Sequence, residues 1–313
     1  MGSLPVGCED VERAAGVIAG QLQRTPMLSC RTLGPNVHLK AELFQRTGSF
    51  KPRGVLTKLD SLTAEEKARG VIAASAGNHA AALAFGAALH GTDALVVMYQ
   101  GASEVKLRAA EAYGATIDLE ATGPGDVFER LAELEQETGR VLVHPFDDPL
   151  VVAGQGTVGL EILEDVAGVE RIVVPCGGGG LVSGIAIAAE DTDVEIVAVE
   201  PKNSRALQAA LEVGESIRVE ARTAADGLNA PFAGELVLEV AQTHGVRTVL
   251  VTEDEIAEGF RFLYQRAKLA CELAGAAAVA ALLAGKVEAA NTVCVVSGGN
   301  VAAQTAAGIL ASP

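Results

Sequence analysis

The amino-acid sequence predicts an α/β protein with two interwoven parallel-sheet domains. The main observation is an alternation of short apolar strands and helical segments over residues 70–147, which is typical of βαβ units with parallel strands. A length of 313 residues with 49% apolar side chains supplies enough core for two lobes. The chain has 35 glycines and only 4% aromatic residues, which suits many tight strand-to-helix turns better than an all-β sandwich.

The first 69 residues predict a helix, a strand and two further helices. Helical spacing of apolar residues extends over 11–22 and stops before Pro26. Residues 37–43 alternate as a short strand does, and a helix is expected after Lys51 and through Leu62. The acidic segment at 63–67 predicts a surface helix that Thr63 and Glu66 cap.

Residues 70–147 predict a small α/β domain. Four apolar strands alternate there with three helical segments, and most connections contain glycine, serine or asparagine. The expected strands are 71–74, 94–98, 115–119 and 141–143, and the expected helices are 79–89, 103–113 and 128–137.

The second lobe is expected to contain three more strands, at 171–175, 195–200 and 292–296. The first and last of these end in glycine-rich turns, and no internal repeat or low-complexity linker separates the lobes. We expect the N-terminal segment to return and pack with this lobe. The predicted division is a large domain of residues 1–69 and 148–313 and a small domain of residues 70–147.

Charge and cysteine content exclude several classes of partner. There are 24 Lys and Arg against 40 Asp and Glu, a formal charge of −16, which argues against nucleic acid or an anionic membrane as a partner. Five cysteines without CxxC spacing indicate neither a disulfide framework nor a zinc site. The N-terminus lacks an apolar signal core, and the longest apolar run, 274–285, is too short to span a bilayer. A cytoplasmic protein is expected.

The first candidate for chemistry is Lys51, which follows Phe50 and precedes Pro52. A lysine amine becomes a nucleophile near neutral pH when burial or a nearby cation lowers its pKa, and it then commonly forms a Schiff base with a carbonyl cofactor. Taken alone, residues 47–54 favour a solvated lysine before an apolar helix. The surrounding motifs decide between these interpretations.

The second candidate is the run from Gly177 to Gly180, which follows a strand and precedes the helical residues 182–189. Successive glycines let the backbone approach a ligand closely, and their amides with the helix start form an anion site. The pattern is neither a dinucleotide GxGxxG nor a Walker motif. It predicts a site for a cofactor phosphate, with a flexible turn as the alternative.

Two further turns follow strands, at the edge where parallel sheets bind ligands. The segment Ser75-Ala76-Gly77-Asn78-His79 offers a hydroxyl, open amides and a helix start that could hold a carboxylate, although helix capping alone would also explain it. A histidine just inside a helix is more often structural than catalytic. Ser297 begins a third such turn, Ser-Gly-Gly-Asn, and its hydroxyl can donate or accept a hydrogen bond.

Together these motifs resemble the serine/threonine dehydratase family of fold type II (tryptophan-synthase-β-like) pyridoxal phosphate enzymes. The resemblance covers nearly the whole chain in the right order. The motifs that carry it are Gly48-Ser49-Phe50-Lys51, Ser75 to His79, His144-Pro145-Phe146-Asp147-Asp148, Gly154-Gln155-Gly156-Thr157, Gly177 to Leu181 and Ser297-Gly298-Gly299-Asn300.

The resemblance implies pyridoxal 5'-phosphate as cofactor and a role for each matched residue. Lys51 would form the aldimine and act as the Cα base, Phe50 would flank the cofactor ring, and Asn78 would bond its phenolic oxygen. The other implied contacts are Gly177, Gly178, Gly179, Gly180 and Leu181 with the phosphate, Ser297 with the pyridine nitrogen, Gly227 and Glu272 near the ring, and Ser75, Ala76, Gly77, Asn78 and His79 with the substrate carboxylate.

The implied reaction is the dehydration of a 3-hydroxy amino acid such as L-threonine or L-serine to a 2-oxo acid and ammonia. A neutral hydroxyl at Ser297 cannot hold a pyridinium proton as a carboxylate does, and the weaker electron sink favours elimination. The resemblance also implies that the large domain binds the cofactor, that the small domain binds the substrate carboxylate, and that the protein is a homodimer or homotetramer acting on a small amino acid.

Comparison with the family's motifs bears on two alternative functions and on a metal site. Racemases that resemble this family carry a second serine where this chain has Ala76, which argues against racemisation. A non-catalytic ligand-binding module would be expected to lack Lys51, which is present. Cation-binding relatives carry Glu-Pro followed by an acid, but Glu200-Pro201 is followed by Ala206 at the position of that acid, so no metal site is predicted.

Overall fold

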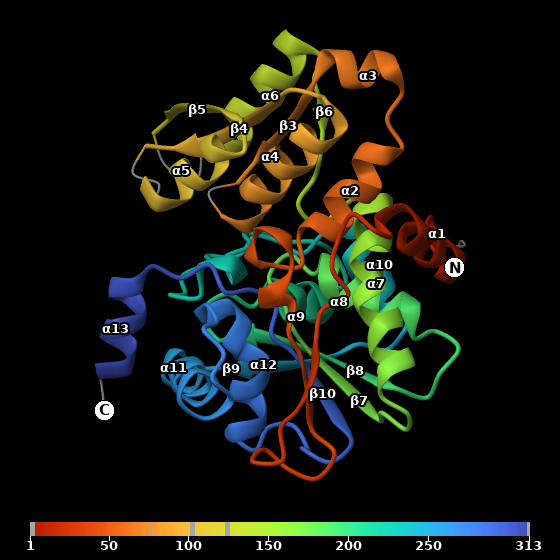
Figure 1. The fold of residues 1–313 in the computed structure, drawn as a ribbon, viewed down its shortest axis with the longest axis vertical. Helices are drawn as coiled ribbons and strands as arrows, with labels where there is room; N and C mark the ends of the chain where they lie inside the picture. The colour runs from red at the N-terminus through yellow and green to blue at the C-terminus, as the bar shows by residue number, and fades with distance from the viewer. Residues whose placement is uncertain (1–3, 76, 101–103, 123–125, 312–313) are drawn as a thin grey trace.

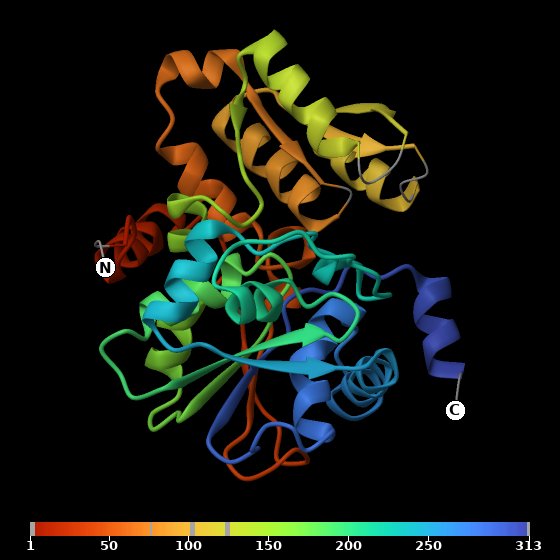
Figure 2. The same ribbon diagram turned by 180° about the vertical axis from the view of Figure 1, so that it is seen from behind.

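The computed structural model describes residues 4–75, 77–100, 104–122 and 126–311, and it confirms the α/β fold class. Figure 1 shows two lobes, each built around its own sheet. Figure 2 shows the same two lobes from behind, with the C-terminal helix lying apart at the side of the larger one. No helix in the described ranges is long and apolar enough to cross a membrane.

The smaller lobe has a four-stranded, fully parallel sheet in the order β5-β4-β3-β6. Alternate residues of its strands face different cores: Val71 packs with α4, whereas Ile72 packs with α6. Both faces are therefore covered, as parallel sheets require. The elements are β3 (Val71–Ala74), α4 (Asn78–His90), β4 (Ala94–Tyr99), α5 (Glu104–Ala112), β5 (Thr116–Ala121), α6 (Val127–Thr138) and β6 (Val141–Leu142).

The larger lobe has a six-stranded sheet in the order β1-β2-β10-β7-β8-β9, parallel except for the pair β1 and β2. One face packs against α1 and α7 to α10, and the other against α11 and α12. The strands are β1 (Met27–Ser29), β2 (His38–Lys40), β7 (Arg171–Pro175), β8 (Glu195–Pro201), β9 (Arg247–Val251) and β10 (Thr292–Val295).

The helices of this lobe and of its connections include several short irregular turns. The α-helices are α1 (Cys8–Ile18), α2 (Pro52–Asp60), α3 (Ala64–Arg69), α7 (Pro149–Asp165), α8 (Gly180–Ala188), α9 (Ala206–Val213), α10 (Glu235–Thr243), α11 (Glu253–Phe262), α12 (Leu273–Leu283) and α13 (Ala303–Ala311). The short turns are 3-10 helices at Glu42–Phe44, Arg46–Gly48 and Asp226–Leu228, and a π-helical turn at Leu263–Ala267.

The N-terminal segment does return to the larger lobe, because β2 pairs with β10, a strand near the other end of the sequence. His38 lies opposite Val293 and Lys40 opposite Val295. Helix α2 contacts both lobes, since Val55 and Leu59 pack in the core of the smaller lobe while the same helix packs along α7. The boundaries at residues 69 and 148 stay a prediction.

Most of the helices and strands expected from the sequence are present, and some bounds and elements were predicted wrongly or missed. The bounds of β3 and β7 match the prediction, and Thr63 and Glu66 form the expected capping box. The first helix begins and ends earlier than expected, at Cys8 and Ile18. Strands β1 and β9 were not predicted. Helix α7 was also missed, because its glycines resemble a loop.

The glycines of α7 are explained by packing. A Cβ at Gly154 would lie 2.5 Å from the Arg53 carbonyl oxygen, and one at Gly156 would lie 2.7 Å from the Gly184 carbonyl oxygen. Backbone-to-backbone contact with α2 and α8 therefore requires glycine at both positions. The Gly-Gln-Gly-Thr motif is a helix-packing feature of the larger lobe.

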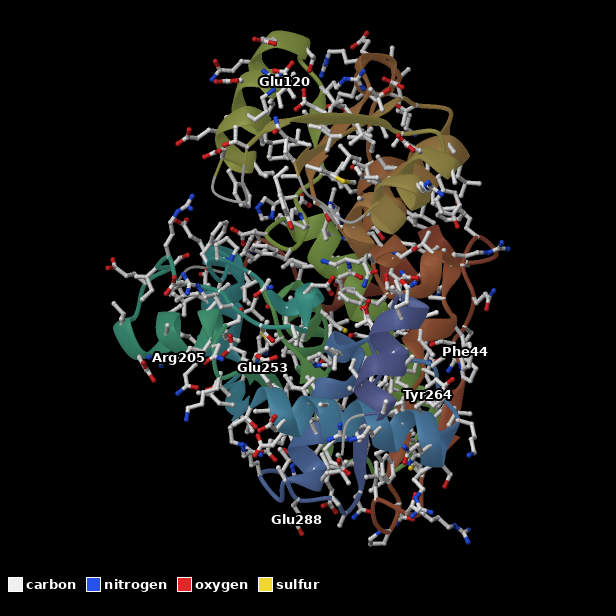
Figure 3. All side chains as sticks on the ribbon, turned by 90° about the vertical axis from the view of Figure 1, so that its left-hand side faces the viewer. Phe44, Glu120, Arg205, Glu253, Tyr264 and Glu288 are labelled. Carbon is white, nitrogen blue, oxygen red and sulfur yellow. The ribbon has the colours of Figure 1, made fainter. Side chains whose placement is uncertain are left out.

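The surface carries the acidic charge expected from composition. Figure 3 shows Glu120 at the far end of the smaller lobe and Glu288 at the opposite end of the larger one, both with exposed side chains. With a formal charge of −16, any anionic ligand has to be held by local groups, which the site below supplies.

Candidate active site

Lys51 lies at the start of α2, the helix that contacts both lobes. The residues before it bridge to the turn after β10: Ser49 forms an isolated antiparallel bridge with Gly298, and the Phe50 amide donates to the Ser297 carbonyl at 3.2 Å. Pro52 at the first helical position fixes the backbone beyond the lysine. Lys51 and Ser297 are therefore brought together, as the sequence predicts.

The Lys51 amine is half-buried and has no anionic partner among its described contacts. Its Nζ donates to the Pro145 carbonyl at 2.8 Å and lies 5.1 Å from the centre of the Phe50 ring. Burial lowers the pKa of Lys51 from 10.5 to about 8. A useful fraction of the amine is thus neutral near physiological pH, which is the form that reacts with a carbonyl.

The glycine run forms a tight turn between β7 and α8. Gly179 has φ +94°, a conformation that favours glycine, and a Cβ there would lie 2.2 Å from Val237 Cγ1. A Cβ at Gly178 would lie 2.3 Å from the Phe146 ring, and one at Gly180 would lie 2.9 Å from Phe146 Cα. The absence of side chains on these glycines therefore lets Phe146 and Val237 pack directly against the backbone of the turn. The first amides of α8 have no acceptor within the helix and can bind an anion.

Gly177 and Leu181 attach this turn to the rest of the site. A Cβ on Gly177 would lie 3.1 Å from Leu228 Cα, next to Gly227. Gly227 in turn approaches Glu272, whose Oε1 would lie 3.7 Å from a Cβ at that position. The Leu181 side chain is buried in the core of the larger lobe and anchors the first turn of α8.

Asn78 joins the two lobes through hydrogen bonds of its side-chain amide. Its Nδ2 donates to Glu272 Oε1 at 2.6 Å, and its Oδ1 accepts from Asn300 Nδ2 at 2.8 Å. Asn300 Nδ2 also donates to the Thr47 carbonyl at 2.7 Å. Asn300 was not predicted to be a site residue, although its place in the turn that begins at Ser297 could have indicated it.

The turn before α4, where the sequence predicts a carboxylate site, has two backbone amides that already donate hydrogen bonds. The Ser75 amide donates to the Val97 carbonyl at 3.2 Å. The Gly77 amide donates to Ser75 Oγ at 3.2 Å. His79 is buried, and its Nε2 donates to the Val143 carbonyl at 2.8 Å. Burial, with a smaller contribution from Lys51, lowers the pKa of His79 to about 3, so its ring is neutral. Ala76 lies outside the described residues.

A buried ionic network next to Lys51 was not foreseen from the sequence. The fully buried Arg53 guanidinium donates to Glu42 at 2.8 and 2.9 Å and to Glu161 at 2.7 and 3.0 Å. The fully buried Lys40 contacts the same Glu161 at 2.6 Å. Two cations thus face two carboxylates, and they connect the first turn of α2 to α7. The signal in the sequence that could have indicated this network is the presence of single charged residues, such as Lys40 and Arg53, within apolar segments.

Glu200, the acid of the Glu-Pro pair at the end of β8, interacts with the first turn of α9. Glu200 is buried and accepts hydrogen bonds from the Leu207 and Gln208 amides, at 2.8 and 2.9 Å, so it caps the start of α9. Burial raises the pKa of Glu200 to about 7. Within the described ranges, no group of three or more His, Cys, Asp and Glu residues could hold a metal ion.

The parts of the site fit pyridoxal phosphate. The glycine turn has no room for a Cβ at Gly178 or Gly179, and α8 begins directly at this turn. Lys51 supplies an amine of lowered pKa. Fold and site are thus those of a fold type II α/β enzyme. The family model of the pyridoxal-phosphate-dependent enzymes matches residues 18–298, and the chain belongs to this family.

Relatives and solved structures agree with this assignment. The catabolic L-threonine dehydratase TdcB of Escherichia coli K12 is 40% identical over 310 residues, covering 95% of this chain and 94% of the relative. A solved threonine deaminase from T.th. is 37% identical with a TM-score of 0.88, covering 95% and 99% of the two chains. Maize serine racemase is 33% identical with a TM-score of 0.91, covering 96% and 95%.

Proposed function

We propose that this protein is a pyridoxal-phosphate-dependent ammonia-lyase that dehydrates a 3-hydroxy amino acid, L-threonine or L-serine, to a 2-oxo acid and ammonia. The observation that carries the proposal is the Lys51 amine, whose pKa burial lowers to about 8 and whose Nζ bonds the Pro145 carbonyl, next to the Phe146 ring that packs on the glycine turn. The 40% identical L-threonine dehydratase supports the same reaction class.

Each part of the site has one task in this reaction. The amides of residues 177–181 would hold the cofactor phosphate, Ser297 the ring nitrogen and Asn78 the phenolic oxygen, with Gly227 and Glu272 near the ring. When bound, pyridoxal phosphate supplies the electron sink for the charge that develops at the substrate Cα. Phe50, whose ring lies beside the Lys51 amine, limits the access of water to that amine.

Lys51 both holds the cofactor and moves the proton. A neutral amine with a pKa of about 8 can take the Cα proton, and as an ammonium ion it can return a proton later. The Pro145 carbonyl orients Nζ by accepting its hydrogen bond. Elimination needs no second base, because Cα is not reprotonated on its opposite face. The Cβ–O bond breaks and the hydroxyl leaves as water, with a proton that the Lys51 ammonium group can supply.

The turn at residues 75–79 would bind the substrate carboxylate. Its amides and the start of α4 provide hydrogen-bond donors and a partial positive charge. His79 stays neutral and structural, since its ring bonds the Val143 carbonyl and its pKa is about 3.

Racemisation of serine is the second candidate, since a serine racemase is 33% identical to this chain. Racemases need a second acid or base on the face opposite the lysine, and the chain has alanine at position 76, where related racemases carry serine. We therefore expect elimination to dominate. Chiral analysis of serine recovered after long incubation would contradict this expectation if D-serine accumulated faster than pyruvate.

The central experiment is a substrate panel with purified holoenzyme. Release of 2-oxo acid should be measured from threonine, serine, 3-hydroxyaspartate and phenylserine. The expected result is release from threonine or serine, and loss of both turnover and the bound-cofactor absorbance in Lys51→Ala. Unchanged turnover in Lys51→Ala would refute the assignment of the lysine.

We also propose a cytoplasmic homodimer or homotetramer and the domain division given by residues 1–69 with 148–313 and by residues 70–147. The family resemblance supports the oligomer, and light scattering of the purified holoenzyme tests it. Limited proteolysis tests the boundaries: cleavage is expected first near residues 69 and 148 if the small domain is a separate unit.

A further inference from the structure

Four rings gather at one point of a chain that is poor in aromatic residues. The chain has eight phenylalanines, three tyrosines and no tryptophan. Phe232 contacts the rings of Phe146, Phe128 and His144, with centroids 5.4, 6.0 and 6.5 Å apart, and His144 lies 4.7 Å from Phe146. We call Phe128, His144, Phe146 and Phe232 the aromatic cluster. Phe232 is its centre, because it contacts all three other members.

The aromatic cluster joins the two lobes. Phe128 lies in α6 of the smaller lobe and also packs against that lobe's core. Phe232 follows the turn at Asp226–Leu228 and precedes α10 of the larger lobe, and its side chain is half-buried. His144 and Phe146 lie on the segment that connects β6 to α7. Ring contacts across the junction are thus made only while the lobes are close together.

The aromatic cluster also adjoins the reactive amine and the glycine turn. Pro145, between His144 and Phe146, accepts the hydrogen bond of Lys51 Nζ. The charge of Lys51 contributes to the lowered pKa of His144, after burial as the largest cause, so the two groups are close. Phe146 packs on Gly178 and Gly180. One side of the space around Lys51 is therefore formed by rings.

The direction of the substrate side chain follows from the remaining parts of the site. The carboxylate is expected at the start of α4 and the cofactor phosphate at the start of α8. For a substrate whose Cα lies within reach of Lys51, we then expect Cβ to point toward the side that the rings form. That side is apolar, and the His144 ring is kept neutral because burial lowers its pKa. Small apolar groups gain from such contact, whereas a carboxylate would lose its hydration without a partner.

We propose that Phe232 is a specificity-determining residue and that the aromatic cluster forms an apolar wall that accepts hydrogen or methyl on the substrate Cβ and excludes a charged group there. This proposal rests on the proposed function, and it narrows the substrate to threonine and serine, with threonine preferred. A well-fitted methyl pocket discriminates by about tenfold or more. Because Phe128 comes from the other lobe, the wall is complete only when the lobes are closed.

The test compares Phe232→Ala and Phe232→Leu with the wild-type holoenzyme. The first readout is kcat/KM for threonine, serine and 3-hydroxyaspartate. The second is the dissociation constant of two unreactive amino acids, 2-aminobutyrate and alanine, which differ by the same methyl group and are followed through the visible spectrum of the bound cofactor. Tyr113→Ala is the matched control, because Tyr113 stacks edge-on with Phe85, in a ring pair separate from the aromatic cluster.

We expect the wild type to prefer threonine over serine by about tenfold and to bind 2-aminobutyrate more tightly than alanine by several-fold. Phe232→Ala should abolish both preferences, Phe232→Leu should retain part of them, and Tyr113→Ala should retain both in full. Unchanged preferences in Phe232→Ala and Phe232→Leu, each with normal cofactor absorbance, would overturn the proposal.

Other outcomes are equally informative. Preference of the wild type for 3-hydroxyaspartate over threonine would overturn the apolar wall while leaving the dehydratase function intact. Absence of 2-oxo acid from every substrate would refute the proposed function, and the binding of 2-aminobutyrate and alanine would still decide on the wall. If Phe232→Ala fails to fold, Phe232→Leu alone decides by the same criteria.

Discussion

Replacing Lys51 by methionine should stabilise the cofactor-free protein near neutral pH. Burial lowers the pKa of the amine from 10.5 to about 8, so folding disfavours the ammonium form. A difference of this size corresponds to about 3 kcal/mol. Methionine is of similar length and has no charge to desolvate, but it loses the hydrogen bond to the Pro145 carbonyl, worth about 1 kcal/mol. We expect a net gain of about 2 kcal/mol at pH 7.

The gain should depend on pH in a defined direction. Below pH 8 the amine of Lys51 is protonated in both the folded and the unfolded state, and the full cost of burying the charge is present. Between pH 8 and 10.5 the folded state has lost the proton while the unfolded state keeps it, so the free energy of unfolding rises with pH. Above pH 10.5 both states are neutral, and the advantage of methionine should disappear.

Urea denaturation of the cofactor-free proteins at pH 7 and in steps through pH 10.5 measures this effect. Lys202→Met is the control, because Lys202 is exposed and its charge remains in water in the folded state. The reasoning is refuted if Lys51→Met is no more stable than the wild type at pH 7, or if its advantage is the same at both ends of the pH range.

Three further changes test other parts of the site. Arg53→Met leaves the buried Glu42 and the half-buried Glu161 without the guanidinium between them and should lower the free energy of unfolding by about 3–5 kcal/mol; a urea-derived loss below about 1 kcal/mol would contradict this. Gly178→Ala places a Cβ 2.3 Å from the Phe146 ring and should weaken cofactor binding at least tenfold in absorbance titrations, with wild-type affinity as the contrary result. Asn300→Ala frees the Asn78 amide on one side and should shift the bound-cofactor spectrum and reduce kcat more than it changes KM; an unaltered spectrum and kcat would show that the bond has no positioning role.

Local sequence patterns were sufficient where one segment determines its own structure. Strands β3 and β7 are short apolar runs between polar or glycine-rich boundaries, and their bounds were predicted correctly. The glycine turn after β7 and the lysine at the start of α2 were also recognisable, because each needs particular residue types at consecutive positions. The fold class and the family could be predicted from such segments in their order.

Features that depend on contacts between distant segments were not predictable. Helix α7 contains glycines at 154 and 156 that only the approach of α2 and α8 explains. The partners of Arg53 come from positions 42 and 161, and nothing in the local pattern pairs them. The orientation of Asn78 by Asn300 joins residues 222 positions apart. Such pairings belong to the tertiary structure and not to any local segment.

The central place of β10 in the larger sheet has a consequence for biosynthesis. This strand, residues 292–295, separates β2 from β7, and the turn that follows it bridges to the segment before Lys51. The sheet therefore stays split into unpaired parts while most of the chain is being translated, and the reactive lysine lacks its final surroundings throughout that time. Such long-range pairing slows folding and exposes strand edges to aggregation. Newly made chains should depend on molecular chaperones until β10 inserts, and cofactor capture should report the completion of folding.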